Sequence, residues 1–256
     1  MNILLTNDDG YTSEGIKAVY RTLSKDHDVY VAAPASQKSA VGHGISLGKP
    51  MKIHHIEGGY AIEGTPADCV KVAVCSFFRD IKFDMVVSGI NDGVNLGSDV
   101  FYSGTVAGAR EGVINNIPAI ACSMNRPVSD EKFEASAEVI RQLVLSLEEI
   151  KICEKYILNV NFPSATKFRG ANFTHLGNRI YDEVVCVEDK EGIMYATVVI
   201  DDGITFISKE GSDIDCIHAG CVSITPMSNE YFIPSFVSKI SGLTSKLNTA
   251  LARNKQ

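Results

Sequence analysis

Two adjacent carboxylates stand out near the start of the chain, where Asp8 and Asp9 directly follow a short apolar run. Like charges that leave a buried strand together repel each other unless a cation or strong hydrogen-bond donors compensate them. Carboxylate oxygens are hard ligands that suit Mg²⁺ or Mn²⁺. The alternative is an acidic turn, because Asp is a common turn former and Gly10 follows at once. By themselves these residues favour a metal site and a turn about equally.

Hydroxyl and amide side chains recur in two later polar segments. The segment after Pro34 carries Ser39, whose hydroxyl could reach a ligand, and His43, a candidate assisting base or donor. A lone histidine in a loop is more often solvated or structural than catalytic. Asn91 and Asn95 lie in a glycine-rich segment. An asparagine can offer a carbonyl oxygen to a metal or an N–H group to a phosphate.

A predicted helix begins at Ser103-Gly104-Thr105, which combines two hydroxyl groups with a glycine. The first N–H groups of a helix have no partner within it, and they lie at the positive end of its dipole. Such a helix start binds anions, phosphate groups among them. The alternative is that Ser103 is only an N-cap. Anion binding is favoured because the other polar segments are predicted to lie at the same edge of a sheet.

Apolar runs that alternate with amphipathic segments indicate how these residues come together. The alternation over about the first 165 residues predicts an α/β fold, in which a mostly parallel sheet carries helices on both faces. The predicted strands are 2–6, 29–33, 85–88, 118–123 and 156–161, and the predicted helices begin near Ser13, Thr65, Ser103 and Ser129. Ligands of such sheets bind at the carboxyl ends of the strands. The polar segments are therefore expected to converge at the carboxyl ends of the strands, where together they suit metal-assisted chemistry at a phosphate.

The pattern changes after Pro163, where strong helical periodicity is lost. Residues 184–187, 195–200 and 221–225 are predicted strands, the first two antiparallel to each other. Apolar residues between 236 and 251 recur at the spacing of one helical face. We therefore expect a C-terminal β-rich extension that ends in a helix. No linker-like stretch precedes it, so it is expected to be a subdomain of the same unit.

The composition excludes several classes of protein. The 256 residues are 45% hydrophobic and 21% charged, which excludes a disordered or fibrous chain. The net charge of −7 provides no overall basic surface for polymeric nucleic acid. No apolar run is long enough to span a membrane and no secretory signal is evident, so we expect a cytoplasmic protein. The seven cysteines lack the spacings of metal or disulfide motifs.

Taken together, these segments resemble the SurE (survival protein E) family of metal-dependent phosphatases that act on nucleoside monophosphates. The matching strings follow the family's order over nearly the whole chain. They are Ile3–Gly10 with Gly15, Ala33–Ser39 with Gly42-His43, Gly64–Val70, Ser88–Gly97, Tyr102–Ala107, Asn159–Pro163 and Gly220–Pro226. One position departs from the family, because His175 stands where its members usually carry Arg. This departure puts in doubt the contacts of that C-terminal stretch.

The resemblance implies a Rossmann-like core and a defined site. One divalent ion per subunit, Mg²⁺ or Mn²⁺, is expected to be held by Asp8, Asp9, Ser39 and Asn91. A phosphate cradle is expected from Asn95, Ser103, Gly104 and Thr105. The resemblance also implies a single domain over residues 1–256. Its core covers about 1–165, and a C-terminal part, about 166–256, exchanges between the subunits of a homodimer or homotetramer.

The resulting hypothesis is a 5′-nucleotidase that hydrolyses nucleoside 5′- and 3′-monophosphates to nucleoside and phosphate. Asp8 or Asp9 would accept the proton of the attacking water, and the sequence does not choose between them. Direct attack by an aspartate is disfavoured, because the D-x-D pattern of aspartyl-phosphate phosphatases is absent at this strand end. The alternatives are a broad phosphatase or exopolyphosphatase, a non-catalytic nucleotide-sensing module and a structural assembly protein.

Overall fold

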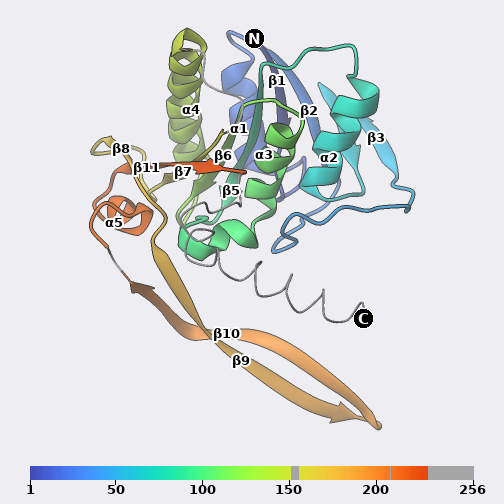
Figure 1. The fold of residues 1–256 in the computed structure, drawn as a ribbon, viewed down its shortest axis with the longest axis vertical. Helices are drawn as coiled ribbons and strands as arrows, with labels where there is room; N and C mark the ends of the chain where they lie inside the picture. The colour runs from blue at the N-terminus through green and yellow to red at the C-terminus, as the bar shows by residue number, and fades with distance from the viewer. Residues whose placement is uncertain (151–155, 208, 230–256) are drawn as a thin grey trace, which may run out of the picture.

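A nine-stranded sheet forms the centre of the molecule. The computed structural model describes residues 1–150, 156–207 and 209–229, and Figure 1 shows their arrangement. The first half of the chain forms β1 (Asn2–Thr6), α1 (Glu14–Leu23), β2 (Asp28–Pro34), β3 (Ile53–Ile56), β4 (Gly59–Ile62), α2 (Pro66–Val72), the π-helical turn η1 (Ala73–Phe77), β5 (Met85–Asp92), the 3₁₀ helix η2 (Gly97–Phe101) and α3 (Gly104–Ile114). The second half forms β6 (Ala119–Met124), α4 (Asp130–Ile150), β7 (Tyr156–Phe162), β8 (Ala171–Phe173), β9 (Asn178–Lys190), β10 (Ile193–Ile207), α5 (Asp213–His218) and β11 (Val222–Ser228).

The order of strands across the sheet is β3-β4-β2-β1-β5-β6-β7-β11-β8. All neighbouring pairs from β4 through β7 are parallel. The edge strand β3 is antiparallel to β4, and β11 is antiparallel to β7. The predicted mostly parallel sheet is therefore confirmed. All the parallel strands in this series end at the same edge of the sheet, which gathers the polar segments that follow them.

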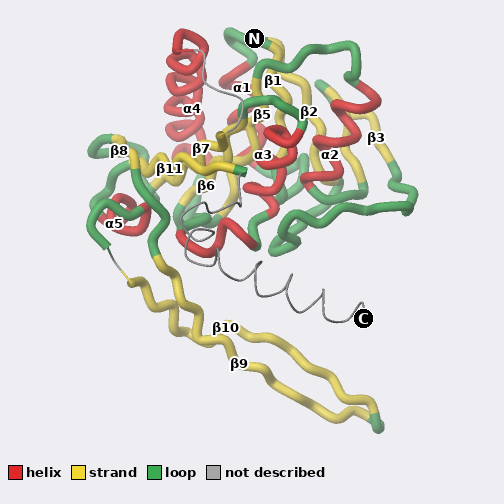
Figure 2. The backbone as a smooth tube through the Cα atoms, viewed as in Figure 1, coloured by secondary structure: helices red, strands yellow, loops and turns green. Residues whose placement is uncertain are grey.

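Helices cover both faces of the sheet, as predicted. Alternate residues of a strand point to opposite faces, and β1 shows this clearly. Ile3 and Leu5 pack in one core cluster together with residues of α1 and α4, while Leu4 packs in a second cluster with residues of α2 and α3. The helices appear on the two sides of the strands in Figure 2. Both faces of the central strands are buried, which explains why their sequences are continuously apolar.

Two helices begin at the capping residues that the sequence predicts. The Thr65 hydroxyl accepts a hydrogen bond from the Asp68 N–H, and the Asp68 carboxylate accepts one from the Thr65 N–H, with Pro66 in the first turn. The Ser103 hydroxyl accepts a hydrogen bond from the Val106 N–H at the start of α3. Each cap provides an acceptor for an N–H group that the helix itself leaves without one. The start of α3 is thereby held at a definite position beside the sheet.

The structure extends one predicted strand and adds elements that the sequence pattern does not reveal. β5 continues beyond Ser88 to Asp92, with a shift of register against β6 between Ser88 and Asn91. The glycine and asparagine residues of this stretch are typical of a turn, which is why the strand was expected to end earlier. The β3–β4 hairpin, β8 and the short helix α5 were also not expected. All are short, and short elements carry weak periodicity.

The C-terminal part is β-rich, as predicted. β9 and β10 pair antiparallel into a long two-stranded ribbon that projects from the body of the molecule (Figure 1). β11 and β8 instead return to the central sheet beside β7. The predicted terminal helix between 236 and 251 lies outside the described residues. Within the described residues, no helix is long and apolar enough to cross a membrane.

Candidate active site

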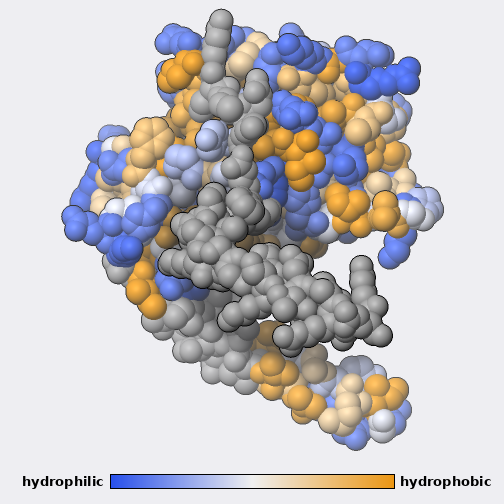
Figure 3. All heavy atoms as spheres, viewed as in Figure 1, coloured by the Kyte–Doolittle hydropathy of each residue, from blue (hydrophilic) through white to orange (hydrophobic). Residues whose placement is uncertain are grey.

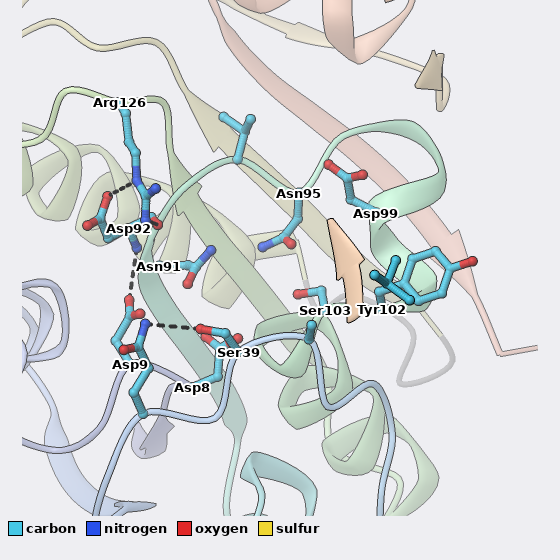
Figure 4. A pocket seen from close by; sticks show the side chains of 14 residues that line it. Asp8, Asp9, Ser39, Asn91, Asp92, Asn95, Asp99, Tyr102, Ser103 and Arg126 are labelled. Atoms are coloured by element: carbon cyan, nitrogen blue, oxygen red, sulfur yellow. Dashed lines mark hydrogen bonds and ion pairs between the residues drawn. The ribbon is translucent and has the colours of Figure 1, made fainter. Parts of the chain in front are cut away.

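A cavity of about 380 Å³ lies at the carboxyl ends of the central strands. Its walls come from the ends of β1 and β5, the loop after β2, the start of α3 and the loop after β6 (Figure 4). The lining residues are Asp8, Asp9, Gln37, Ser39, Ala40, Asn91, Asp92, Val94, Asn95, Asp99, Tyr102, Ser103, Arg126 and Val198. Of the residues predicted for the site, Asp8, Asp9, Ser39, Asn91, Asn95 and Ser103 thus meet around one cavity.

The two adjacent carboxylates follow β1 directly and are each held by a donor from a distant segment. The Thr105 hydroxyl donates to Asp8 Oδ1 over 2.5 Å. The Asp92 N–H donates to Asp9 Oδ2 over 2.9 Å. Asn7 stabilises the turn that carries the two carboxylates, because its side-chain amide donates to the Gly10 carbonyl over 2.8 Å. The carboxylates are therefore fixed in place by β5 and α3 and not only by their own turn.

Burial dominates the electrostatics of this pair. Asp8 is only 5% exposed, and its burial raises the pKa of the carboxyl to about 6. The Thr105 hydrogen bond opposes this rise, while the negative charge of Asp9 adds to it. Burial also raises the pKa of Asp9, with the Asp92 N–H and the Arg126 guanidinium acting in the opposite direction. A nearby positive charge would stabilise the charged forms of these adjacent carboxylates, of which Asp8 is buried and Asp9 partly buried.

The predicted ligands Ser39 and Asn91 approach the same carboxylates. The Gln37 side-chain amide donates to Ser39 Oγ over 3.0 Å. The Asn91 side-chain amide donates to the Gly93 carbonyl over 2.7 Å. This bond fixes which end of the Asn91 amide carries the nitrogen, and Figure 4 shows its oxygen turned toward Asp8 and Ser39. Carboxylate, hydroxyl and amide oxygens therefore share one side of the cavity.

The predicted phosphate cradle is divided between lining and supporting residues. Asn95 and Ser103 line the cavity, whereas Gly104 and Thr105 are buried behind it and are not among the lining residues described. The Thr105 side chain is directed to Asp8. A Cβ atom at Gly104 would lie 2.8 Å from Asp8 Cβ, so the absence of a side chain lets α3 approach the carboxylate. The first N–H groups of α3 remain donors without partners in the helix.

His43 lies outside the set of residues that line the cavity. Its Nε2 is 2.9 Å from Glu111 Oε2, and Lys71 Nζ is 2.6 Å from Glu111 Oε1. Glu111 belongs to α3 and is almost fully buried. The structure therefore places His43 in a polar group around Glu111 and not among the residues that line the cavity. His175 also lies elsewhere, with its ring nitrogens 3.1 Å from the carbonyl oxygens of Leu176 and Glu210.

Sequence reasoning did not single out five polar or aromatic residues that line the cavity. They are Gln37, Asp92, Asp99, Tyr102 and Arg126. Arg126 Nε donates to Asp92 Oδ1 over 2.8 Å, and Arg126 is the one basic side chain among the lining residues described. Asp92 directly follows Asn91. A sequence prediction that extended β5 to Asp92 would have placed this residue at the strand end, beside the site. Arg126 lies just after β6, and the strand-end rule applied there would have found it.

The oxygen ligands around Asp8 fit a hard divalent cation. Within the described residues, no group of three or more His, Cys, Asp or Glu side chains is arranged to hold a metal ion. The candidate set instead combines the carboxylates of Asp8 and Asp9 with the Ser39 hydroxyl and the Asn91 amide oxygen. Mg²⁺ and Mn²⁺ prefer such oxygen donors and Mg²⁺ keeps several water ligands, whereas Zn²⁺ favours nitrogen and sulfur.

Comparison with known proteins connects this geometry to a family. The model of the family described as survival protein SurE matches residues 3–183, which include every residue of the candidate metal and phosphate sites. The chain belongs to the SurE family. The structure is similar to that of the SurE protein from Aquifex aeolicus, with a TM-score of 0.82 and 35% sequence identity over 96% of this chain and 100% of that one.

Two curated SurE relatives extend the comparison to named activities. A protein named 5′-nucleotidase SurE from Petrotoga mobilis is 39% identical over 241 residues, covering 89% of this chain and 93% of the relative. A protein of the same name from Legionella pneumophila is 40% identical over 232 residues, covering 89% of this chain and 90% of the relative. The SurE resemblance inferred from the sequence strings is thereby confirmed.

Proposed function

We propose that this chain is a metal-dependent 5′-nucleotidase that hydrolyses nucleoside 5′- and 3′-monophosphates to nucleoside and phosphate. The observation that carries the proposal is one cavity in which Asp8, Asp9 and Asn91 stand beside Asn95 and Ser103. The first group suits a divalent cation, and the second suits the oxygens of a phosphate. The names of the relatives, which are 37–40% identical over most of the chain, support the same activity.

Different residues of the cavity would bind the metal ion and the phosphate during hydrolysis. Asp8, Asp9, Ser39 and Asn91 would hold one Mg²⁺ or Mn²⁺ ion. When bound, the ion supplies positive charge for the phosphoryl group and makes a nearby water more acidic. The Ser103 hydroxyl, the Asn95 amide and the first N–H groups of α3 donate hydrogen bonds to the remaining phosphoryl oxygens. These donors are neutral, so the acidic protein needs no basic surface for an anionic substrate.

Asp9 is the carboxylate that we assign to proton transfer. Asp8 is almost fully buried, and its Oδ1 already accepts the short Thr105 hydrogen bond. Asp9 is less buried, and the Asp92 N–H engages its Oδ2, which leaves Oδ1 to accept the proton of the attacking water. A carboxylate within hydrogen-bond reach of the water suffices for this role. As the water oxygen bonds to phosphorus and the bond from phosphorus to the nucleoside oxygen breaks, the proton taken by Asp9 is returned through solvent to that leaving oxygen, and nucleoside and phosphate are released.

The activity is tested by measuring phosphate release from nucleoside 5′- and 3′-monophosphates and from short polyphosphate, with Mg²⁺ or Mn²⁺ added. We expect turnover of the monophosphates, loss of turnover after exhaustive chelation, and recovery when the metal is restored. Asp8→Asn keeps the shape of the side chain and removes its charge, so turnover is expected to fall by about a thousandfold or more. Polyphosphate turnover at least equal to that of nucleotides would favour the broader phosphatase.

The surface variant Glu63→Gln serves as the matched control, because Glu63 also carries a carboxylate but pairs at the surface with Lys52 and His54. It is expected to keep wild-type turnover. Full activity after chelation, or in a folded Asp8→Asn protein, would contradict the metal-dependent mechanism. Nucleotide binding without any turnover would instead identify a sensing module.

We further propose that the β9–β10 ribbon binds a second copy of the chain, giving a homodimer or homotetramer. The pairing register places Val185, Val187, Met194 and Val198 on one face of the ribbon and Ile193, Tyr195 and Val199 on the other. These side chains are all exposed, and Figure 3 shows apolar atoms near the end of this projecting ribbon. Exposed apolar side chains gathered in one segment typically mark an association surface. Val198 also lines the cavity, so assembly through the ribbon would affect one wall of the active site.

A further inference from the structure

Asn161, at the end of β7, is paired with the main chain of Asn95. Asn161 Oδ1 accepts a hydrogen bond from the Asn95 N–H over 2.8 Å, and Asn161 Nδ2 donates to the Asn95 carbonyl over 3.2 Å. Asn161 is fully buried and Asn95 nearly so. One side-chain amide thus binds both polar groups of a residue that lies 66 positions earlier in the chain.

Three polar side chains in one row of the sheet lead to this contact. The strand register places Asn91 opposite Ser123 and Ser123 opposite Asn161. Residues opposite each other on neighbouring strands point to the same face. The row begins at Asn91, which borders the proposed cation site, and ends below Asn95, which borders the proposed phosphate site. Ser123, in the middle, accepts a hydrogen bond from Asn95 Nδ2 over 2.6 Å.

These contacts account for the main-chain hydrogen-bonding groups of Asn95 and for one hydrogen of its side chain. Its N–H and carbonyl are buried and need partners, and within the described structure side chains of β7 provide them. Asn159 Nδ2 also donates to the Asn95 carbonyl, over 2.9 Å. Only Asn161, among the contacts described, provides an acceptor for the Asn95 N–H. One hydrogen of Asn95 Nδ2 goes to Ser123, which leaves the second hydrogen for the cavity that Asn95 lines.

We propose that Asn161 is a positioning residue, which holds Asn95 so that its free amide hydrogen meets a phosphoryl oxygen. Asn161 itself does not touch the substrate. Without it, the Asn95 N–H loses its acceptor while the carbonyl keeps Asn159, so the residue can rotate about its remaining bond. The proposal rests on the proposed function, because it assigns Asn161 to the phosphate side of the same site.

The test compares Asn161→Ala with the wild-type protein in nucleotide hydrolysis and in binding of inorganic phosphate. Loss of one positioned hydrogen bond is expected to raise KM for a nucleoside 5′-monophosphate and Kd for inorganic phosphate about tenfold. The affinity for Mn²⁺, measured by titration calorimetry, is expected to stay within about twofold. Asn161→Ser, which keeps a small acceptor, is expected to recover part of the loss and replaces the alanine variant if that fails to fold.

The matched control is Thr225→Val in β11. Thr225 is also buried, and its hydroxyl is 2.7 Å from Thr174 Oγ1 and outside the cavity lining. It is expected to lower thermal stability without changing KM or phosphate affinity. Unchanged phosphate affinity in folded Asn161→Ala would overturn the proposal, as would an equal loss in Thr225→Val. Absence of hydrolysis by the wild-type protein would count against the proposed function alone, because phosphate binding still tests Asn161.

Discussion

Thr105 illustrates how the role of one residue depends on its partner. The sequence places it at a helix start that is typical of phosphate binding, and the structure directs its hydroxyl to Asp8 Oδ1. The hydroxyl stabilises the charged form of a buried carboxylate and so lowers the pKa of Asp8 against the effect of burial. The side chain therefore supports the proposed cation site, while the Thr105 N–H stays a predicted phosphate donor.

Thr105→Val tests this support because it keeps the shape of the side chain and removes the hydroxyl. The pKa of Asp8 should rise further, and the protein should bind Mn²⁺ about tenfold more weakly at neutral pH, as expected for loss of a charged hydrogen bond. Titration calorimetry measures the affinity. Thr174→Val, which removes a hydroxyl bonded to Ser223 and Thr225 outside the cavity, is the control. Equal Mn²⁺ affinity in the Thr105 variant and the wild type would contradict this role.

At the scale of elements, the start of α3 is the part of the fold most closely coupled to the site. It approaches the end of β1 so closely that no side chain fits at Gly104. Further along the helix, Glu111 connects α3 to Lys71 of α2 and to His43 in the loop after β2. The helix is thus anchored at its N-terminal end by close packing and beyond it by the contacts of the buried Glu111 carboxylate.

Gly104→Ala should damage both stability and activity. The new Cβ would lie 2.8 Å from Asp8 Cβ and 2.9 Å from Asp8 Oδ2. Such overpacking costs about 1–3 kcal/mol and would displace the helix start from the carboxylate, so turnover should fall by at least tenfold. Gly170→Ala is the matched control, because nothing lies within 4 Å of the added Cβ there. Chemical denaturation and phosphate release measure the two effects, and equal behaviour of both variants would refute the packing argument.

Glu111→Gln should change how stability depends on pH. Burial raises the pKa of Glu111, but hydrogen bonds from His43 and Lys71 outweigh it and hold the pKa below the usual 4.5. A depressed pKa stabilises the folded state above about pH 4.5, and that contribution disappears as the pH falls through the lower folded value. At pH 7 the variant should be about 2 kcal/mol less stable, in line with charged buried hydrogen bonds.

The measurement is urea denaturation between pH 7 and pH 3. The difference in unfolding free energy between wild type and Glu111→Gln should shrink below pH 4.5 and approach a constant small value. Glu63→Gln, at a surface carboxylate, should show little difference across the same range. A difference between wild type and Glu111→Gln that does not depend on pH would show that packing, and not the ion pairs, accounts for the effect.

At the scale of the whole molecule, the β9–β10 ribbon projects from the body of the described structure (Figure 1). It exposes Val185, Val187, Met194 and Val198 on one face and Ile193, Tyr195 and Val199 on the other. Next to the ribbon, α5 is bound to the core. Asp213, in α5, accepts hydrogen bonds from the N–H groups of Gly97 and Gly177 over 2.8 and 2.7 Å. The ribbon thus extends from an anchored base, which suits a rigid arm that reaches another subunit.

Val187→Lys should weaken the proposed assembly, because a charge among the exposed apolar side chains of the ribbon must be desolvated when copies associate. The mass measured by light scattering during size exclusion should shift toward that of one chain at micromolar concentration. Gln142→Lys adds the same charge at an exposed position of α4, away from the ribbon, and should leave the mass unchanged. A wild-type protein that is already monomeric at high concentration would contradict the assembly proposal.

The sequence by itself determined the alternation of strands and helices and the polar segments at the strand ends. Apolar periodicity, capping residues such as Thr65 and Ser103, and turn formers are local signals, and a single segment carries each of them. These signals, with the rule that parallel strands present ligands at their carboxyl ends, predicted that the segments carrying Asp8, Asp9 and Asn91 converge at one edge of the sheet. The resemblance to the SurE family, and not these local signals, implied which of their side chains form the metal site. The division of the chain near residue 165 stays a prediction.

Only the tertiary structure decided which side chains support that site. The hydrogen bonds from Thr105 to Asp8 and from Asn161 to Asn95 join residues 97 and 66 positions apart. The same holds for His43, which pairs with Glu111 across 68 positions and not with the cavity. Such pairings depend on the order and register of the strands and on the angle at which α3 packs. Local propensity contains no information about these quantities, because they arise only when distant segments share one core.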